Sequence, residues 1–365
     1  MAAITAARVV TPSGTLAPGV VDVDDTTGLI AEVRSASGPA RDVVLAPGFV
    51  DLQVNGIGDI DVAHASGDDW DRLDALLAAQ GTTAWCPTLV TAPLASYADR
   101  LAAIAGARDR SGARPAMIGA HLEGPFLGGA PGAHRLDLIV DPDLGWIAAL
   151  PDVVVLTTLA PEAHRATDAI TAFTRRHVVV SLGHSTATFA ESIDAVDSGA
   201  RLVTHLFNGM GALHHREPGL LGAALTDDRL TVSLIADLVH VHPAAIHLAF
   251  SSKGAGRVVL VTDAVAWERG AVGGTPLHVA DGAPRLADGT LAGSMLTMDR
   301  AVANVVDRCD VALDDAVRAA STTPAALMGL ADRGAIDVGR RADLVALDPD
   351  LACVATWIGG EAVHG

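Results

Sequence analysis

Three residues of the types that bind catalytic metals stand out in the sequence, because each ends a short apolar run. They are one carboxylate and two imidazoles: Glu123, His184 and His205. Three such ligands leave a fourth position on zinc open, which is the pattern of a catalytic metal site. Any one of these histidines alone would be read as a core residue, but together with Asp263 they favour a metal centre. A closed structural zinc site would need cysteines, and none lies nearby: the three in the chain are Cys86, Cys309 and Cys353.

Asp263 and His240 are candidates for the proton-transfer and carbonyl-polarising roles of a hydrolysis. Asp263 follows the apolar run Val258–Val261, which would carry its carboxylate into a partly desolvated site. There it could take a proton from water and return it to a departing amine, although a helix N-cap is the alternative. His240 could polarise a carbonyl. His242 lies two residues on, and at least one of the two is expected to be a surface histidine.

A cationic segment and a glycine-rich segment could complete the site. Arg216, in the run His-His-Arg-Glu-Pro-Gly, is suited to bidentate binding of a phosphate or carboxylate. Pairing with the adjacent Glu217 is the alternative. The glycine-rich stretch 128–132, just before His134, predicts a mobile lid over the site.

The elements that must position these residues are short apolar runs separated by amphipathic or alanine-rich stretches. This alternation is typical of repeated β-then-α units. Eight runs predict an α/β fold, a (β/α)8 TIM-like barrel, whose active site lies at the carboxyl ends of the strands. The candidates above fall at those ends. The runs are Phe49–Asn55, Thr82–Pro87, Met117–Leu122, Val153–Leu159, Val178–Leu182, Leu202–His205, Thr231–Ala236 and Val258–Thr262.

Helices and a second domain are expected around this barrel. The pattern predicts helices over Asp69–Gln80, Thr188–Asp197, Thr297–Arg308 and Leu313–Ala320, with Thr323 as the N-cap of another. Both chain ends carry short alternating runs with turn residues, so residues 1–45 and 333–365 are expected to form one small β-sandwich domain beside a barrel of residues 46–332. The expected strands are Ile4–Val10, Val20–Val23, Leu29–Val33, Ala335–Val338, Ala342–Leu347 and Cys353–Ile358.

Composition excludes several classes of function. The 365 residues are 50% hydrophobic and carry 43 acidic against 25 basic side chains, a net charge of −18. That charge repels nucleic acid, so no nucleic-acid partner is expected. No apolar stretch is long enough for a membrane span and no signal-peptide pattern opens the sequence, so a cytoplasmic protein without a membrane partner is expected.

Eight motifs in order give the sequence a specific resemblance: APGFVDLQVNG, GAHLEGPF, SLGHSTAT, THLFNGM, REPG, VHVHP, LVTDA and LAGSMLTMD. They resemble the N-acetylglucosamine-6-phosphate deacetylases of the amidohydrolase superfamily, from about residue 44 to residue 330. The C-terminal GAIDVGRRADLVALD is similar to the closing β segment of that superfamily. The resemblance implies hydrolysis of N-acetyl-D-glucosamine 6-phosphate to D-glucosamine 6-phosphate and acetate, a step of amino-sugar catabolism and cell-wall recycling, by a homodimeric enzyme.

The same resemblance implies a role for each site residue. Glu123, His184 and His205 match the metal ligands, Asp263 matches the catalytic acid and base, and His240 matches the residue that polarises the substrate carbonyl. Gln53 and Asn55 stand where many amidohydrolases have two histidines, which implies one divalent metal, zinc before other transition metals. The residues that match the substrate-binding positions are Asn208, Gly209, Arg216, His134, which could act across a dimer interface, and Leu296, which matches the lining of the acetyl pocket.

Three departures from the family pattern bear on the substrate. Gly209 replaces the usual alanine, Leu238 stands where a glycine is usual, and Pro131 stands where a lysine is common. The alternatives are therefore a deacetylase of another N-acetyl-hexosamine phosphate, such as N-acetylgalactosamine 6-phosphate, or an N-acyl amino acid hydrolase. A barrel that only binds a sugar would have lost a metal ligand or Asp263, and this sequence keeps all four.

Overall fold

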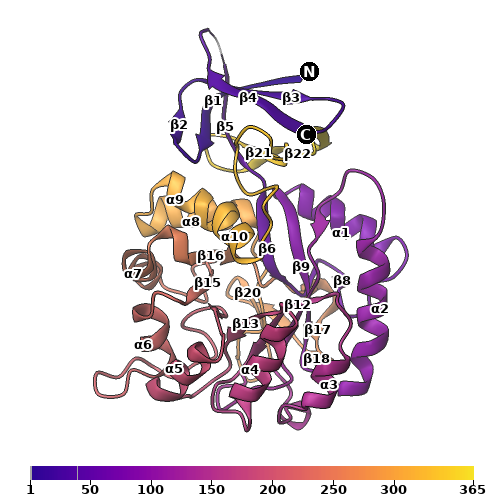
Figure 1. Ribbon diagram of the computed structural model, residues 1–365, viewed down its shortest axis with the longest axis vertical. Helices are drawn as coiled ribbons and strands as arrows, with labels where there is room; N and C mark the ends of the chain where they lie inside the picture. The colour runs from indigo at the N-terminus through magenta and orange to yellow at the C-terminus, as the bar shows by residue number, and fades with distance from the viewer. Residues whose placement is uncertain (1, 39) are drawn as a thin grey trace.

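A barrel of eight parallel strands forms the larger part of the molecule (Figure 1). The computed structural model describes residues 2–38 and 40–365, and the count refers to these. The strands pair in chain order, so the predicted barrel and its eight apolar runs are confirmed. They are β6 (Phe49–Val54), β9 (Thr82–Val90), β11 (Ala120–Glu123), β12 (Val154–Leu159), β13 (Val179–Leu182), β14 (Leu202–Val203), β15 (Thr231–Ile235) and β16 (Val258–Val261). A short strand, β10 (Ala116–Met117), also pairs with β9.

Helices cover the outside of the barrel, so its strands are buried on both faces, which explains their lack of alternation. The described helices are α1 (Asp69–Ala78), α2 (Tyr97–Arg108), α3 (Leu144–Ala149), α4 (Ala166–Arg175), α5 (Phe189–Asp197), α6 (Gly219–Thr226), α7 (Pro243–Lys253), α8 (Met298–Cys309), α9 (Leu313–Val317) and α10 (Thr323–Leu327). None of them has both the length and the apolar character needed to cross a bilayer.

Most of the predicted helices are confirmed, and one predicted N-cap is wrong. The predicted start at Thr188 is confirmed by a capping box, in which its hydroxyl accepts from Glu191 N and Glu191 accepts from Thr188 N. The prediction of Thr323 as an N-cap is wrong. A π-helical turn, Arg318–Thr322, joins α9 to α10 without a break, and the Thr323 hydroxyl instead donates to Ala255 O at 2.7 Å.

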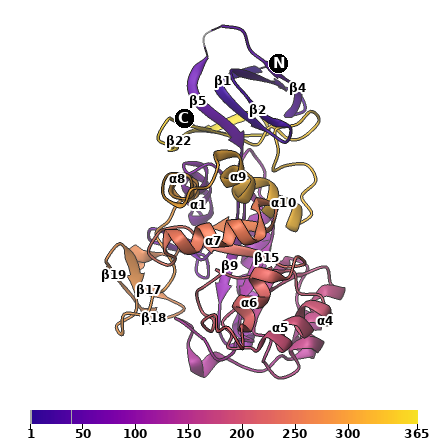
Figure 2. The same cartoon turned by 90° about the vertical axis from the view of Figure 1, so that its left-hand side faces the viewer.

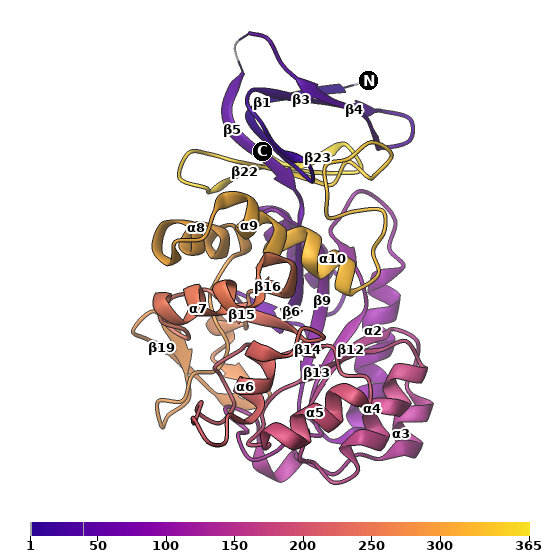
Figure 3. The same cartoon turned by 60° about the vertical axis from the view of Figure 1, so that its left-hand side comes forward.

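Both chain ends join in one eight-stranded, mostly antiparallel sheet, which confirms the predicted small β domain. The sheet folds into two layers, with the C-terminal strands lying between the N-terminal strands and the barrel; helices α8 to α10 cover that end of the barrel (Figure 3). A separate cluster including Val21, Ile30, Leu45 and Leu344 forms its core. The strands are β1 (Ala2–Thr11), β2 (Gly14–Leu16), β3 (Gly19–Asp24), β4 (Leu29–Ser35), β5 (Arg41–Pro47), β21 (Leu344–Leu347), β22 (Cys353–Ile358) and β23 (Glu361–His364).

One predicted strand of this domain is wrong, and three strands were missed. The segment 335–338 forms no strand: Ile336 packs into the core, and the chain then turns, with Gly339 N donating to Ile30 O. Strands β2, β5 and β23 were not predicted. The division into residues 1–45 with 333–365 and residues 46–332 stays a prediction.

Short hairpins outside the barrel reach its mouth. Between β16 and α8 the chain forms two of them, β17 (Ala271–Val272) with β18 (Thr275–Pro276) and β19 (His278–Ala280) with β20 (Ala283–Arg285). Figure 2 shows them projecting at one side of the barrel. A third, β7 (Gly56–Ile57) with β8 (Ile60–Asp61), follows β6. None was predicted, because each strand has only two or three residues and no apolar period.

The barrel closes between β6 and β16 without a regular ladder. The backbone joins just past the end of β16, where Asp263 N donates to Gln53 O at 2.9 Å and Asn55 N donates to Ala264 O at 2.8 Å. These hydrogen bonds involve the segments that carry Gln53, Asn55 and Asp263. The seam of the barrel therefore sets the relative positions of three predicted site residues.

A buried carboxylate below these residues strengthens the seam. Asp51 on β6 accepts from the Thr262 hydroxyl at 2.6 Å and from the backbone N of Thr262 and of Gln53, both at 3.2 Å. Asp51 is fully buried, and this burial raises its pKa to about 7. Side-chain hydrogen bonds thus replace missing ladder bonds between the first and last strands.

Replacing Asp51 by Asn should change how stability depends on pH. The pKa of Asp51 is near 4 in the unfolded chain and about 7 in the folded one, so between these values the folded state holds a proton that the unfolded state releases. Wild-type stability should therefore fall, relative to Asp51→Asn, as pH rises from 5 to 8, by roughly 1 to 4 kcal/mol. Urea unfolding of both metal-stripped proteins measures this, and parallel pH profiles would contradict the assignment.

Candidate active site

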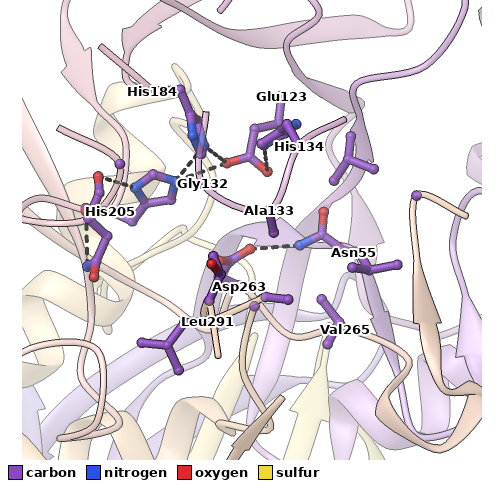
Figure 4. A pocket seen from close by; sticks show the side chains of 18 of the residues that line it. Asn55, Glu123, Gly132, Ala133, His134, His184, His205, Asp263, Val265 and Leu291 are labelled. Carbon is purple, nitrogen blue, oxygen red and sulfur yellow. Dashed lines mark hydrogen bonds and ion pairs between the residues drawn. The ribbon is translucent and has the colours of Figure 1, made fainter. Parts of the chain in front are cut away.

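Most of the predicted site residues meet in one pocket of about 200 Å³ at the carboxyl ends of the barrel strands (Figure 4). Three predicted residues do not line the pocket: Gln53, Arg216 and Leu296. Gln53 still contacts the pocket residue Glu123 from the barrel interior. The predicted residues that line the pocket are Asn55, Glu123, His134, His184, His205, Asn208, Gly209, His240 and Asp263.

Glu123, His184 and His205 bring their ligand atoms together. Glu123 Oε1 lies 3.2 Å from His184 Nε2 and 3.1 Å from His205 Nε2, and the two Nε2 atoms are 3.1 Å apart. All three residues are buried. Burial alone would raise the pKa of Glu123, but the imidazoles of His184 and His205 beside it hold that pKa well below its ordinary value, so the carboxylate is charged.

The second nitrogen of each ring shows that these residues fit a cation. His184 Nδ1 lies 3.2 Å from Ala130 O, and His205 Nδ1 lies 3.1 Å from Asn208 O. A nitrogen beside a carbonyl oxygen must carry hydrogen, so in each neutral ring the lone pair is on Nε2. Two lone pairs and a carboxylate then face one another in a buried volume, an arrangement that a divalent cation would stabilise. Metal-binding histidines are typically oriented in this way.

His134 lies beside this cluster. Its Nε2 is 3.9 Å from Glu123 Oε2, its ring centre is 4.3 Å from that of His184, and its Nδ1 contacts the Thr91 hydroxyl at 2.8 Å. Burial and the neighbouring His184 lower its pKa to about 3, so the ring is neutral. Glu123, His134 and His184 also offer ligand atoms within 4.8 Å of one another. His134 therefore stands next to the candidate metal ligands, a position that the sequence did not predict.

Asp263 faces the cluster across the pocket and is held by two amides (Figure 4). Its Oδ1 accepts from Asn55 Nδ2 at 2.7 Å and from Gln53 Nε2 at 3.0 Å, and Gln53 Nε2 also lies 2.9 Å from Glu123 Oε1. Burial and the nearby charge of Glu123 raise the pKa of Asp263 to about 8. A cation bound beside Glu123 would lower it again. The group can thus gain and lose a proton near neutral pH, as an acid and base must.

His240 is oriented by Asp237, a residue that sequence reasoning missed. His240 Nδ1 lies 2.7 Å from Asp237 Oδ2, and Asp237 Oδ1 accepts from His240 N at 2.8 Å. Burial would raise the pKa of Asp237, but these hydrogen bonds hold it below its usual value. Leu238 between them has φ of +65°, the left-handed region that favours glycine. The loop thus keeps the geometry of a glycine turn at the cost of backbone strain.

Close packing explains the first two glycines of the glycine-rich stretch, and the mobile lid stays a prediction. Glu162 accepts from Gly129 N at 3.0 Å, Thr186 N at 2.7 Å and the Ser185 hydroxyl at 2.6 Å, which ties the stretch to the loop after β13. A Cβ on Gly128 would lie 2.1 Å from Glu162 Oε1, and one on Gly129 would lie 2.2 Å from Thr186 Oγ1. Glu162 was not predicted, since nothing in its sequence context marks it.

Arg216 and Leu296 lie outside the pocket lining. Arg216 is exposed, in the exposed segment 211–217, and its guanidinium contacts His215 Nε2 at 2.9 Å. Leu296 is buried in the barrel core. Within one described chain, neither side chain meets the groups around Glu123. The lining instead includes residues that were not predicted: Val272, Gly273, Thr275, Thr290 and Leu291 of the segment between β16 and α8.

Comparisons with known proteins find relatives over nearly the whole chain. Residues 44–363 match the amidohydrolase family. The chain is 37% identical to an N-acetylgalactosamine-6-phosphate deacetylase of Escherichia coli O157:H7, covering 98% of both chains, and 39% identical to an N-acetylglucosamine-6-phosphate deacetylase of Bos taurus, covering 93% of this chain and 88% of the relative.

Solved structures agree in fold over the full length. The N-acetylglucosamine-6-phosphate deacetylase of Thermotoga maritima superposes with a TM-score of 0.93 at 32% identity, covering 99% of both chains. A mutant of the Mycobacterium smegmatis N-acetyl-D-glucosamine-6-phosphate deacetylase, in complex with N-acetyl-D-glucosamine-6-phosphate, superposes at 0.92 and 34% identity, covering 100% of this chain and 99% of that one.

Glu162→Gln should weaken divalent-cation binding by about 10- to 100-fold, a usual cost of removing a group that orients metal ligands. The amide cannot accept all the hydrogen bonds that now fix Gly129 and Thr186, and Ala130, which orients His184, follows Gly129 directly. Titration of metal-stripped protein against a competing chelator measures the affinity. Glu32→Gln, an exposed change in the terminal sheet, is the control. Equal affinities for the two variants would contradict this role.

Proposed function

The chain belongs to the amidohydrolase family, and on that basis we propose that it hydrolyses the N-acetyl group of N-acetyl-D-glucosamine 6-phosphate to D-glucosamine 6-phosphate and acetate. The observation that carries the proposal is the buried convergence of Glu123, His184 and His205 opposite Asp263. The relatives with this named activity, at 34 to 39% identity, support the choice of substrate.

The three converging residues would hold one divalent cation, and zinc fits a set of one carboxylate and two imidazoles. When bound, such a cation supplies a Lewis acid that activates water and polarises an amide carbonyl. Gln53 and Asn55 hold positions where histidines would be needed for a second cation, and their amide nitrogens instead donate to Asp263. This supports a single metal.

The chain's own residues would then move the protons. Gln53 and Asn55 both donate to Oδ1 of Asp263, so Oδ2 is left to take a proton from the attacking water and to return it to the leaving amine. His240, whose Nδ1 is held by Asp237, has only Nε2 left to hydrogen-bond the carbonyl oxygen of the substrate. Asp263 and His240 are thus the proposed catalytic residues.

Asn208 and Gly209 line the pocket on the side of β14 and would bind the sugar. We assign Arg216 to the phosphate. Because its segment lies outside the pocket lining and is exposed, a homodimer, which we also propose, would let this segment of one chain meet the pocket of the other. The cysteines of the described chain are all free, which supports a reducing, cytoplasmic location.

One observation favours a second candidate substrate. The alignment with the Escherichia coli relative named for N-acetylgalactosamine 6-phosphate covers 98% of both chains. The two sugars differ only in the configuration of one hydroxyl, so the same metal site and the same Asp263 would serve both. An N-acyl amino acid, by contrast, would give Arg216 no phosphate to bind.

Acetate release from the zinc-loaded protein tests the substrate. Turnover is expected with N-acetylglucosamine 6-phosphate, with slower turnover of N-acetylgalactosamine 6-phosphate. Unphosphorylated N-acetylglucosamine should lose at least 100-fold in kcat/KM, because an Arg–phosphate contact is a strong charge-assisted interaction. Faster turnover of the galactosamine sugar would establish the second candidate. Equal turnover of the phosphorylated and neutral sugars would rule out a phosphate anchor.

Substitutions of the catalytic pair should separate their roles. Asp263→Asn should abolish nearly all turnover while metal content stays at one equivalent, because the amide cannot carry the proton. His240→Ala should lower kcat by about 100- to 1,000-fold, the usual cost of losing one oxyanion donor. Single-turnover kinetics and metal analysis of each variant provide the measurement. More than a tenth of wild-type activity in Asp263→Asn would show that another group carries the proton.

A further inference from the structure

A second cavity of about 310 Å³ borders the active-site pocket. It has no role in the mechanism above. Six residues line both spaces, so the two share a wall: Asn55, Val90, Thr91, Arg135, Val272 and Gly273. We name this space, lined also by Ala63, Thr88, Ala92 and Arg100, the side cavity.

The order of the barrel strands places the side cavity on the acyl side of the reacting amide. The proposed sugar-binding residues follow β14, the carbonyl-polarising His240 follows β15, and the proton-carrying Asp263 follows β16. The side cavity lies over the next two strands around the barrel, β6 with Asn55 and β9 with Thr88 and Val90. A substrate with its sugar over β14 and its carbonyl between His240 and Asp263 would point its acyl group onward, toward β6 and β9.

Two polar groups of the side cavity lack partners. Arg100 on α2 is half-buried and has no hydrogen bond or ion pair within residues 2–38 and 40–365. The other lining charges are paired, Arg135 with Asp137 and Asp61 with His64. Asn55, whose nitrogen holds Asp263, has a buried Oδ1 without a partner in the same part of the chain. The remaining walls are mostly apolar, including Ala63, Ala92, Pro93 and Leu138.

We propose that the side cavity is an acyl pocket, which admits N-acyl groups longer than acetyl and favours those that end in a carboxylate. The proposal rests on the proposed function, because it assigns the acyl group of the same reaction. Apolar walls suit the methylene chain, and the unpaired guanidinium of Arg100 suits a terminal carboxylate. The chemistry is unchanged: water adds to the carbonyl, the C–N bond breaks, and the amine leaves with the proton from Asp263.

The test compares three substrates on the metal-loaded full-length protein: N-acetyl-, N-butyryl- and N-succinyl-glucosamine 6-phosphate. The two longer acyl groups have the same four carbons and differ in the terminal carboxylate. We expect kcat/KM for the succinyl substrate to be within about tenfold of that for the acetyl substrate, and above that for the butyryl substrate.

Variants in the side cavity test the location. Arg100→Met keeps an unbranched apolar stem but removes the guanidinium, and it should lower kcat/KM for the succinyl substrate by about 10- to 100-fold, with acetyl and butyryl turnover within about twofold of wild type. Arg108→Met, an exposed change on the same helix, should alter the turnover of none of the three substrates.

Ala92→Leu fills the side cavity and should slow both longer substrates at least tenfold. Ala63→Leu serves as a second filling variant if Ala92→Leu does not fold. Ala103→Leu, exposed on α2, is the matched control.

Each outcome decides a separate point. If the acetyl substrate is cleaved and both longer substrates are more than 1,000-fold slower, the acyl pocket is wrong and the proposed function stands. Unchanged turnover of the longer substrates in both filling variants also overturns it. If Arg100→Met leaves the succinyl rate unchanged, the role of Arg100 is wrong. If no acyl sugar phosphate is cleaved, the proposed function and the acyl pocket fail together.

Discussion

The mutual repulsion of three electron-rich atoms in a buried space is the constraint on which the site depends. Glu123 Oε1 and the Nε2 atoms of His184 and His205 lie within 3.2 Å of one another, and all three residues are buried. Such a cluster is costly without a cation. The surroundings hold it in place. Each imidazole is fixed through its other nitrogen by a carbonyl oxygen, and His184 and His205 both adopt positive φ, a strained conformation common at functional sites.

The second constraint is the unpaired seam of the barrel. Between β6 and β16 a regular ladder is missing, and the hydrogen bonds that replace it come from the residues that position the acid and base. Gln53 donates to both Glu123 and Asp263, so one amide connects a candidate metal ligand to the proton carrier. Two histidines in place of Gln53 and Asn55 would bind a second cation; two amides instead orient a carboxylate. The same pair of positions therefore decides between metal binding and proton placement.

The elements that repeat along the sequence could be predicted from it, whereas contacts made by single residues could not. Eight buried runs and their polar ends are periodic signals, so the barrel and the groups around Glu123 and Asp263 could be predicted. Asp237 and Glu162 could not, because each acts through contacts with a distant or turning segment that has no pattern of its own. The hairpins 271–285 were missed for the same reason. A motif matched Arg216 to the phosphate, but only the fold shows that its segment lies outside the pocket lining.

The exposed guanidinium of Arg216 offers a positive group on a chain whose net charge is negative. A net charge of −18 repels a sugar phosphate, so the anion needs a local positive field. Arg135, at the pocket, is held by Asp137, whereas Arg216 forms no ion pair within residues 2–38 and 40–365, so no neighbouring carboxylate offsets its charge. An exposed guanidinium in water binds phosphate weakly because the solvent screens it. It becomes an effective anchor only when a second surface covers it, and this is the physical reason why the phosphate site and the dimer belong to one proposal.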